Sequence, residues 1–168
     1  MQNKDIFINI VRFLVLVLMQ VFLFNHINFL GYINPYVYLL FIVLFPFNGN
    51  KGLLIFLSFL LGLTVDMFGD SGGVHAGASV FTAFLRPFIL KFSFGVSYEY
   101  DVIKINKTDY SKRIIYILLM VFIHHLVLFS MEIFNMDHIL HVLKSTLFSG
   151  IFSMILLLGM ISLFSRKT

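Results

Sequence analysis

The chain has 168 residues, of which 60% are hydrophobic, only 12% are charged and 22 are phenylalanine. A soluble domain is closer to half apolar and a quarter charged, so this composition excludes an ordinary soluble fold and predicts an integral membrane protein. The absence of cysteine excludes disulfides, thiolate nucleophiles and cysteine-based zinc sites, and the net charge of +4 matters less than the side of the membrane on which the charges lie.

Six apolar stretches predict an all-α integral membrane protein, a six-transmembrane-helix bundle that forms a single membrane domain. We expect the spans at about residues 6–24, 29–47, 52–68, 74–91, 114–131 and 139–164. No small-x-small cleavage site follows the first stretch, so we expect it to remain as an uncleaved helix. The longest polar segment, residues 92–113, is expected to be a cytoplasmic loop.

The second stretch is the weakest span by length. The run from Tyr36 to Phe47 gives only about 18 Å of helix, against a hydrocarbon core of about 30 Å, so a re-entrant segment is the alternative. Charge favours six spans, because the three outer loops then carry no Lys or Arg. We therefore expect both termini in the cytoplasm, and a second span that borrows residues 29–33 or crosses where the bilayer is thin.

Polar and small residues follow one face of each of the next two spans. On the third span the face has a four-residue period and holds Ser58, Gly62, Asp66 and Asp70. On the fourth span the matching face holds His75, Ser79, Thr82 or Ala83, and Arg86, while Gly73 and Gly77 form a small-xxx-small pair. Such small-residue faces let a neighbouring helix approach closely.

The short turn at residues 69–73 joins these two spans and predicts a contact between Asp66 and His75 near the outer face. Arg86 lies about 16 Å deeper than His75, so it is expected to snorkel toward the cytoplasmic headgroups or to pair with another chain. Three interpretations of Asp66 and His75 stay open: a helix cap with an internal hydrogen bond, an interface for another membrane protein, and catalysis or ion relay.

Other candidate chemistry is weakly supported, and the sequence predicts no metal or cofactor site. The pair Asp66 and Asp70 resembles half of a metal–diphosphate site, which needs further acids on a facing helix. Those acids could only be Glu132 and Asp137 in the last outer loop, where His138 and His141 are better explained as interfacial caps than as metal ligands. The adjacent His124 and His125 point about 100° apart on a helix, so we expect one of them to face the bundle.

The stretch from Gly62 to Ala78 suggests a family. Its Gly-x-x-x-Asp pattern, short Ser/Gly turn and Gly-Val-His-Ala-x-Ala pattern resemble the signature of MreD, a bacterial rod shape-determining membrane protein. Length, span number and small outer loops agree with this resemblance. Residues 25–27, 36–46 and 84–87 look like the Bacteroidota branch. The positions that match the motif are Gly62, Asp66, Gly73 and His75, whereas Asp70 and Gly72 depart from it.

The resemblance implies a non-enzymatic scaffold of the cell-elongation complex in the bacterial inner membrane, without a cofactor. Its implied partners are the single-span protein MreC, RodA with its transpeptidase, indirectly the MreB filaments, and the lipid bilayer, but no nucleic acid. We expect the stripe of Ser58, Gly62 and Asp66 to present a face to these partners.

Two other classes remain. The substrate-binding subunit of an energy-coupling-factor vitamin transporter has a similar size and span number. It usually carries an alanine-rich first helix, whereas the first span here has no alanine. A membrane enzyme that acts on a lipid-linked diphosphate rests only on Asp66 and Asp70.

Overall fold

The computed structural model describes residues 3–27, 29–31, 33–47, 49–95, 105, 108–134 and 138–165. The helices in these residues are α1 (Asn3–Phe22), the 3-10 turn η1 (Phe24–His26), α2 (Leu39–Leu44), α3 (Lys51–Gly69), α4 (Val74–Phe94), α5 (Tyr110–Ile133) and α6 (Ile139–Ser165). The only β pairing among them is an isolated bridge between Phe29 and Ile33. The prediction of an all-α membrane bundle is confirmed.

Within the described part of the chain, four helical segments are long and apolar enough to cross a membrane: Phe7–His26, α3, α5 and the part of α6 from Ile139 to Ser162. The protein is therefore a multi-pass membrane protein. α4 is a continuous helix of similar length, with 21 residues, but its sequence contains several polar side chains and Pro87. α2 has only six helical residues, so the expected second span at residues 29–47 is a helix only in its last part. The number of crossings, six, stays a prediction.

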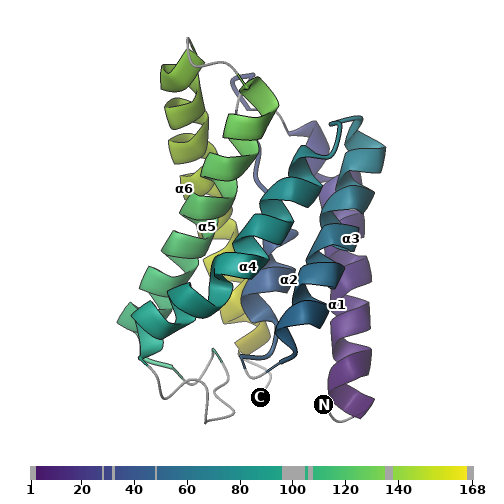
Figure 1. Cartoon of the computed structure of the whole chain (residues 1–168), viewed down its shortest axis with the longest axis vertical. Coiled ribbons are helices and arrows are strands. Elements are labelled where there is room, and N and C mark those ends of the chain that lie inside the picture. Colours follow the sequence, from purple (N-terminus) through teal and green to yellow (C-terminus); the bar gives the residue numbers. More distant parts are fainter. Residues whose placement is uncertain are drawn as a thin grey trace.

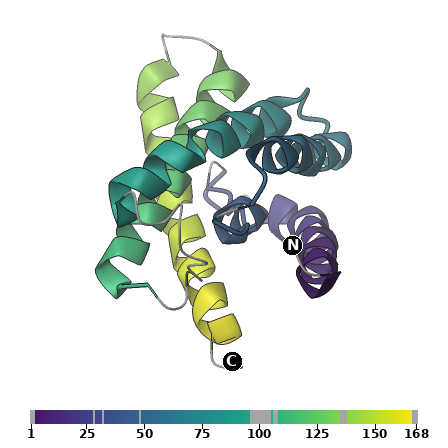
Figure 2. The same cartoon turned by 60° about the horizontal axis from the view of Figure 1, so that its bottom comes forward.

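The short helix α2 lies inside the bundle. Leu39, Leu40, Phe41, Ile42 and Val43 are each at most 1% exposed, and the end-on view shows the other helices around them (Figure 2). Because lipid is as apolar as these side chains, burial gives little driving force in a membrane, and close packing and polar contacts hold such a segment in place. A helix this short also leaves backbone groups at both ends that need partners within the protein.

The longer helices form a layer beside α2. α3 packs on α4, α4 on α5 and α5 on α6, while α1 packs mainly on α3 and α2 at the edge. α1 begins and α6 ends at the same end of the bundle (Figure 1). Lys51, Lys91 and Lys112 lie at that end, in the first or last turn of α3, α4 and α5. The arrangement agrees with the predicted grouping of basic residues on one side of the membrane.

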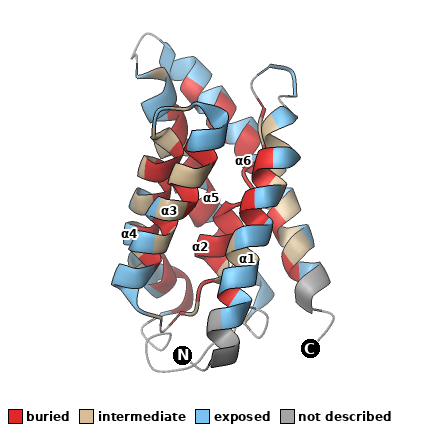
Figure 3. Cartoon of the chain, turned by 90° about the vertical axis from the view of Figure 1, so that its right-hand side faces the viewer, coloured by how far each residue is buried: buried red, intermediate tan, exposed pale blue. Residues whose placement is uncertain are grey.

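The helices differ in how much surface they expose. α1 shows a long exposed face along its outer side (Figure 3), whereas all the residues of α2 except the last, Leu44, are buried. The expected loop at residues 92–113 is shorter than predicted, since α4 continues to Phe94 and α5 starts at Tyr110. Most of the remaining loop lies outside the described residues.

Candidate functional site

The turn between α3 and α4 has a left-handed backbone. Asp70 follows the end of α3 with φ of 48°, and Gly72 and Gly73 have φ of 67° and 93°. Glycine adopts such angles without strain, and Asp is one of the few other residues that does so readily. Gly73 occupies the N-cap position of α4 and has no side chain to accept a hydrogen bond. The first N–H groups of α4 therefore need acceptors from elsewhere.

Asp66 supplies those acceptors from the last turn of α3. Its Oδ1 accepts the backbone N–H of His75 at 3.0 Å, and its Oδ2 accepts that of Ala76 at 2.8 Å. The hydroxyl of Ser71 donates to Oδ1 at 2.6 Å, and Nδ1 of His75 lies 2.9 Å from the same oxygen. The expected contact between Asp66 and His75 is confirmed. The carboxylate is also a negative charge at the positive end of the α4 dipole.

The stripe on α3 is covered by α4 of the same chain. Ser58 and Asp66 are buried, and a Cβ atom added to Gly62 would lie 2.5 Å from the Cα of Ala76. The predicted shared face is confirmed for Ser58, Gly62 and Asp66, but the prediction that it faces a partner protein is wrong. Asp70 does not belong to the buried stripe, because the helix ends at Gly69 and Asp70 is exposed.

The predicted face of α4 is confirmed as a buried face. His75, Ser79, Thr82, Ala83 and Arg86 are all buried. The glycine pair is divided between two roles. Gly73 makes the left-handed turn, and a Cβ on Gly77 would meet the end of the Met131 side chain on α5 at 2.6 Å. The small residues of α4 thus serve contacts within the chain.

Arg86 binds inside the bundle, so the expectation that it snorkels to the headgroups is wrong. It is 3% exposed. Its Nη2 donates to the carbonyl of Phe45, its Nε donates to the hydroxyl of Tyr116 at 2.9 Å, and Tyr116 donates onward to the carbonyl of Val43 at 3.1 Å. The guanidinium also lies 5.5 Å from the ring centre of Phe47. The carbonyls at the C-terminal end of α2 make this interior position favourable for a cation.

Both adjacent histidines of α5 face the interior, whereas the sequence predicted this for one of them. The Tyr38 hydroxyl lies 2.8 Å from Nε2 of His124. His125 places Nδ1 2.8 Å from the carbonyl of Val121 and Nε2 2.9 Å from the hydroxyl of Ser153. α5 lies between α4 and α6 and also contacts α2, so it is buried over a wide arc that includes both directions.

Polar side chains from α1 and α6 hold the segment that enters α2. Gln20 accepts the N–H of Val37 at 2.8 Å, and Ser153 accepts that of Tyr36 at 2.9 Å. Ser149 accepts the N–H of Asn34 at 3.1 Å. Our sequence reasoning missed these three side chains. The signal for Gln20 was an amide side chain deep in an apolar span, which is costly unless it is bonded within the protein.

Neither of the two candidate metal sites, at Asp66 and Asp70 or around His138 and His141, finds support in the described residues. The carboxylate of Asp66 is occupied by donors of its own chain, and Asp70 is exposed. Glu132, His138 and His141 are also exposed, and Asp137 lies outside the described residues. No group of three His, Asp or Glu residues within the described part of the chain is placed to hold a metal ion.

The site thus has two charged anchors, Asp66 and Arg86, and a buried cluster of aromatic and histidine side chains beside Asp66. The ring of Tyr36 lies 5.5 Å from that of His75 and 5.3 Å from that of His125, which connects the Asp66 anchor to the centre of the bundle. No family model, curated protein or solved structure matches this chain. The geometry of these residues therefore carries the functional argument.

Proposed function

We propose that this chain is a non-enzymatic scaffold in the bacterial inner membrane, resembling MreD. In this role it links an MreC-like single-span protein to a peptidoglycan synthase pair of RodA and its transpeptidase, and through them to MreB filaments. The proposal rests on the motif at residues 62–78 and on the way in which the structure uses that motif.

The observation that carries the proposal is the state of the Asp66 carboxylate. Two backbone N–H groups, one hydroxyl and one imidazole nitrogen surround its two oxygens. An ionised carboxylate has about four acceptor positions, so little capacity is left for a substrate or a metal ion. The most chemically suggestive residues of the chain therefore build a rigid hairpin, as a scaffold that must present fixed surfaces requires.

The surfaces that remain for partners are the lipid-facing sides of the helices. The stripe on α3 is covered by α4, so it is not offered to another protein. Large apolar side chains are exposed along α1, α5 and α6, with Phe22, Phe122 and Ile155 as examples at 65%, 49% and 63%. In a membrane such faces contact either lipid or other helices.

Co-purification of the full chain in mild detergent tests the proposal. We expect MreC-like and RodA-like chains to be recovered with it. Replacing Asp66 by Ala should weaken that recovery or lower the folded yield, because the caps of α4 are lost. Asp70→Asn is the control at an exposed carboxylate, since Asn also adopts the left-handed backbone of that position. Full recovery of partners and full folded yield with Asp66→Ala would contradict the assigned role of the hairpin.

Two results would favour the other classes. A tightly held riboflavin- or thiamine-like molecule in the isolated protein would favour the vitamin-transporter subunit. Metal-dependent phosphatase activity that Asp66→Asn abolishes would favour the enzyme.

A further inference from the structure

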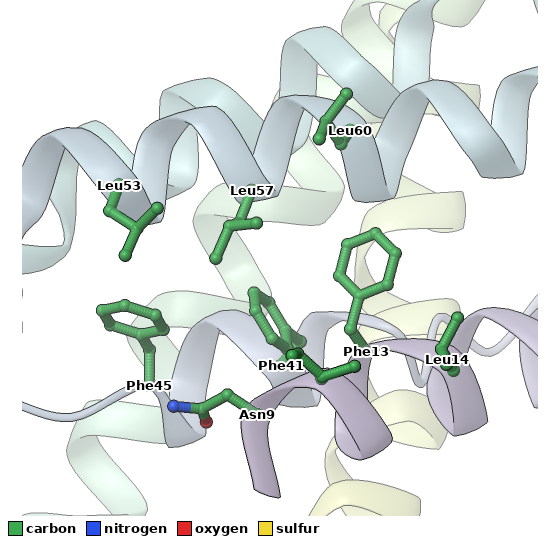
Figure 4. A pocket seen from close by; sticks show the side chains of 9 residues that line it. Asn9, Phe13, Leu14, Phe41, Phe45, Leu53, Leu57 and Leu60 are labelled. Atoms are coloured by element: carbon green, nitrogen blue, oxygen red, sulfur yellow. The ribbon is translucent and has the colours of Figure 1, made fainter. Parts of the chain in front are cut away.

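An apolar groove runs between α1 and α3. Its lining includes Phe13 of α1, Leu57 of α3, Phe41 of α2 and Phe45, the residue that follows α2. The volume of the groove is about 420 Å³. The groove is half open to the outside of the bundle, and the side chains that line it point into the space between the helices (Figure 4). Its size falls within the range of small-molecule sites, and its lining is almost wholly apolar.

The composition of the walls distinguishes between an acyl chain and a protein helix. Close packing of membrane helices uses Gly, Ala, Ser or Thr, which let two backbones approach. The lining of this groove contains none of these and consists of Leu, Ile and Phe, with Asn9 as the only polar residue. A flexible acyl chain can fit between such bulky side chains, whereas the backbone of a partner helix is held away.

A positive side chain at one end of the groove indicates where the headgroup of a lipid would bind. Asn9, Phe45 and Leu53 lie together at that end (Figure 4). Arg12 donates from Nη1 to the side-chain oxygen of Asn9 at 3.1 Å and to the carbonyl of Leu44 at 3.3 Å. A guanidinium has five N–H donors, so these two bonds leave capacity for an anion.

The balance of charge at this end is positive. Lys51 is exposed in the first turn of α3, two positions before Leu53. With Arg12 beside Asn9, two positive charges lie near this end of the groove. Arg12 lies within about 9 Å of the expected start of the first span, which places it within reach of the headgroup region.

We propose that this groove binds an anionic phospholipid, with one acyl chain between α1 and α3 and the phosphate at Asn9, Arg12 and Lys51. A neutral lipid satisfies the apolar walls equally well, but it leaves the positive charge without a partner. The inference does not depend on the scaffold role.

Tryptophan fluorescence tests the proposal, because the chain has no tryptophan of its own. Leu60→Trp places a reporter in the groove, and Phe59→Trp places the matched control at the same depth of α3 but about 100° around the helix, where Phe59 is 42% exposed. Each full-length variant is reconstituted in phosphatidylcholine vesicles that contain a small fraction of brominated phosphatidylglycerol or, separately, the same fraction of brominated phosphatidylcholine.

At Leu60→Trp we expect brominated phosphatidylglycerol to occupy the site about fivefold more readily than brominated phosphatidylcholine, as expected when a basic residue meets an anionic headgroup. At Phe59→Trp we expect no preference. In the Leu60→Trp background, Arg12→Gln should remove most of the preference and Arg12→Lys should keep most of it. Lys51→Gln should lower it without disturbing α2, because Lys51 is exposed.

Three results would overturn the proposal. The first is equal quenching by the two brominated lipids at Leu60→Trp. The second is an anionic preference that persists in the folded Arg12→Gln and Lys51→Gln variants. The third is a Leu60→Trp reporter that neither lipid quenches while the site crosslinks to a second copy of the chain or to another protein.

Discussion

Asp66 and Arg86 meet helix ends of opposite polarity with opposite charges. Asp66 accepts the first N–H groups of α4, and Arg86 donates to a carbonyl at the C-terminal end of α2. In both cases the charge complements the dipole of the helix end. The pair shows how a membrane bundle can contain ionised side chains without a substrate: each one replaces the water that would otherwise bind the ends of helices.

The two anchors differ in their surroundings. Asp66 lies beside a turn whose residues Asp70 and Gly72 are exposed, so water can reach the neighbourhood of its partners. Arg86 is 3% exposed and Tyr116 is 0% exposed. Removal of the deeper anchor should therefore cost more, because an unpaired group in a dry interior keeps its full desolvation penalty.

The largest effect is expected for Arg86→Met. This change leaves the carbonyl of Phe45 and the hydroxyl of Tyr116 without their donor. We expect each unsatisfied buried group to cost about 1 to 3 kcal/mol of unfolding free energy. Equilibrium unfolding in mixed detergent micelles measures it. Arg86→Lys is the matched control, and it should recover part of the loss because it keeps a charge but lacks the planar fork. Equal stability of wild type and Arg86→Met would refute the buried anchor.

The second largest effect is expected for Asp66→Ala. The change removes the acceptors of two backbone N–H groups at the start of α4, and a lost helix cap costs about 1 kcal/mol, or up to about 2 in unfavourable cases. The same unfolding measurement, with Asp70→Asn as the exposed control, should show a clear loss only for Asp66, because Asn keeps the left-handed backbone of position 70. If both variants lose the same amount, the cap is not what stabilises the hairpin.

These anchors also show which contacts the sequence could predict. Asp66 and His75 are nine positions apart and are joined by a glycine-rich turn, so helix geometry alone predicted that they meet. The partners of Arg86 are 30 and 41 positions away, on helices whose relative placement no local pattern determines. Snorkelling was therefore the natural expectation for Arg86, and it was wrong.

The helices of the fold also divide into those that the sequence predicted well and one, α2, that it did not. Long apolar runs predicted the five long helices with ends that differ by a few residues. The short apolar run before Pro46 indicated a weak second span. It did not predict that the segment leading to α2 would be non-helical, or that all the residues of α2 except Leu44 would be buried. That outcome depends on Gln20, Ser149 and Ser153, which reach the backbone from 15 or more positions away.

For Gly62→Ala we expect an effect similar in size to that of Asp66→Ala. The new methyl group would lie 2.5 Å from backbone atoms of His75 and Ala76, which cannot move aside as a flexible side chain can. Overpacking of this kind costs about 1 to 3 kcal/mol. Gly159→Ala is the control, because nothing lies within 4 Å of its added methyl group. Unfolding of the two variants at the same midpoint would contradict the close approach of α3 to α4.

The smallest effect is expected for Tyr38→Phe, which tests whether the buried cluster stabilises the fold or only fills it. The change removes the hydroxyl that bonds Nε2 of His124 at 2.8 Å and keeps the ring. Hydrogen bonds between membrane helices are worth about 0.6 kcal/mol on average, because the separated helices also find partners. A loss near that size, with no loss for Tyr110→Phe at an exposed tyrosine, would assign α2 an ordinary structural bond to α5. A loss as large as that of Arg86→Met would instead show that the bond from Tyr38 to His124 holds α2 in the bundle as strongly as the guanidinium does.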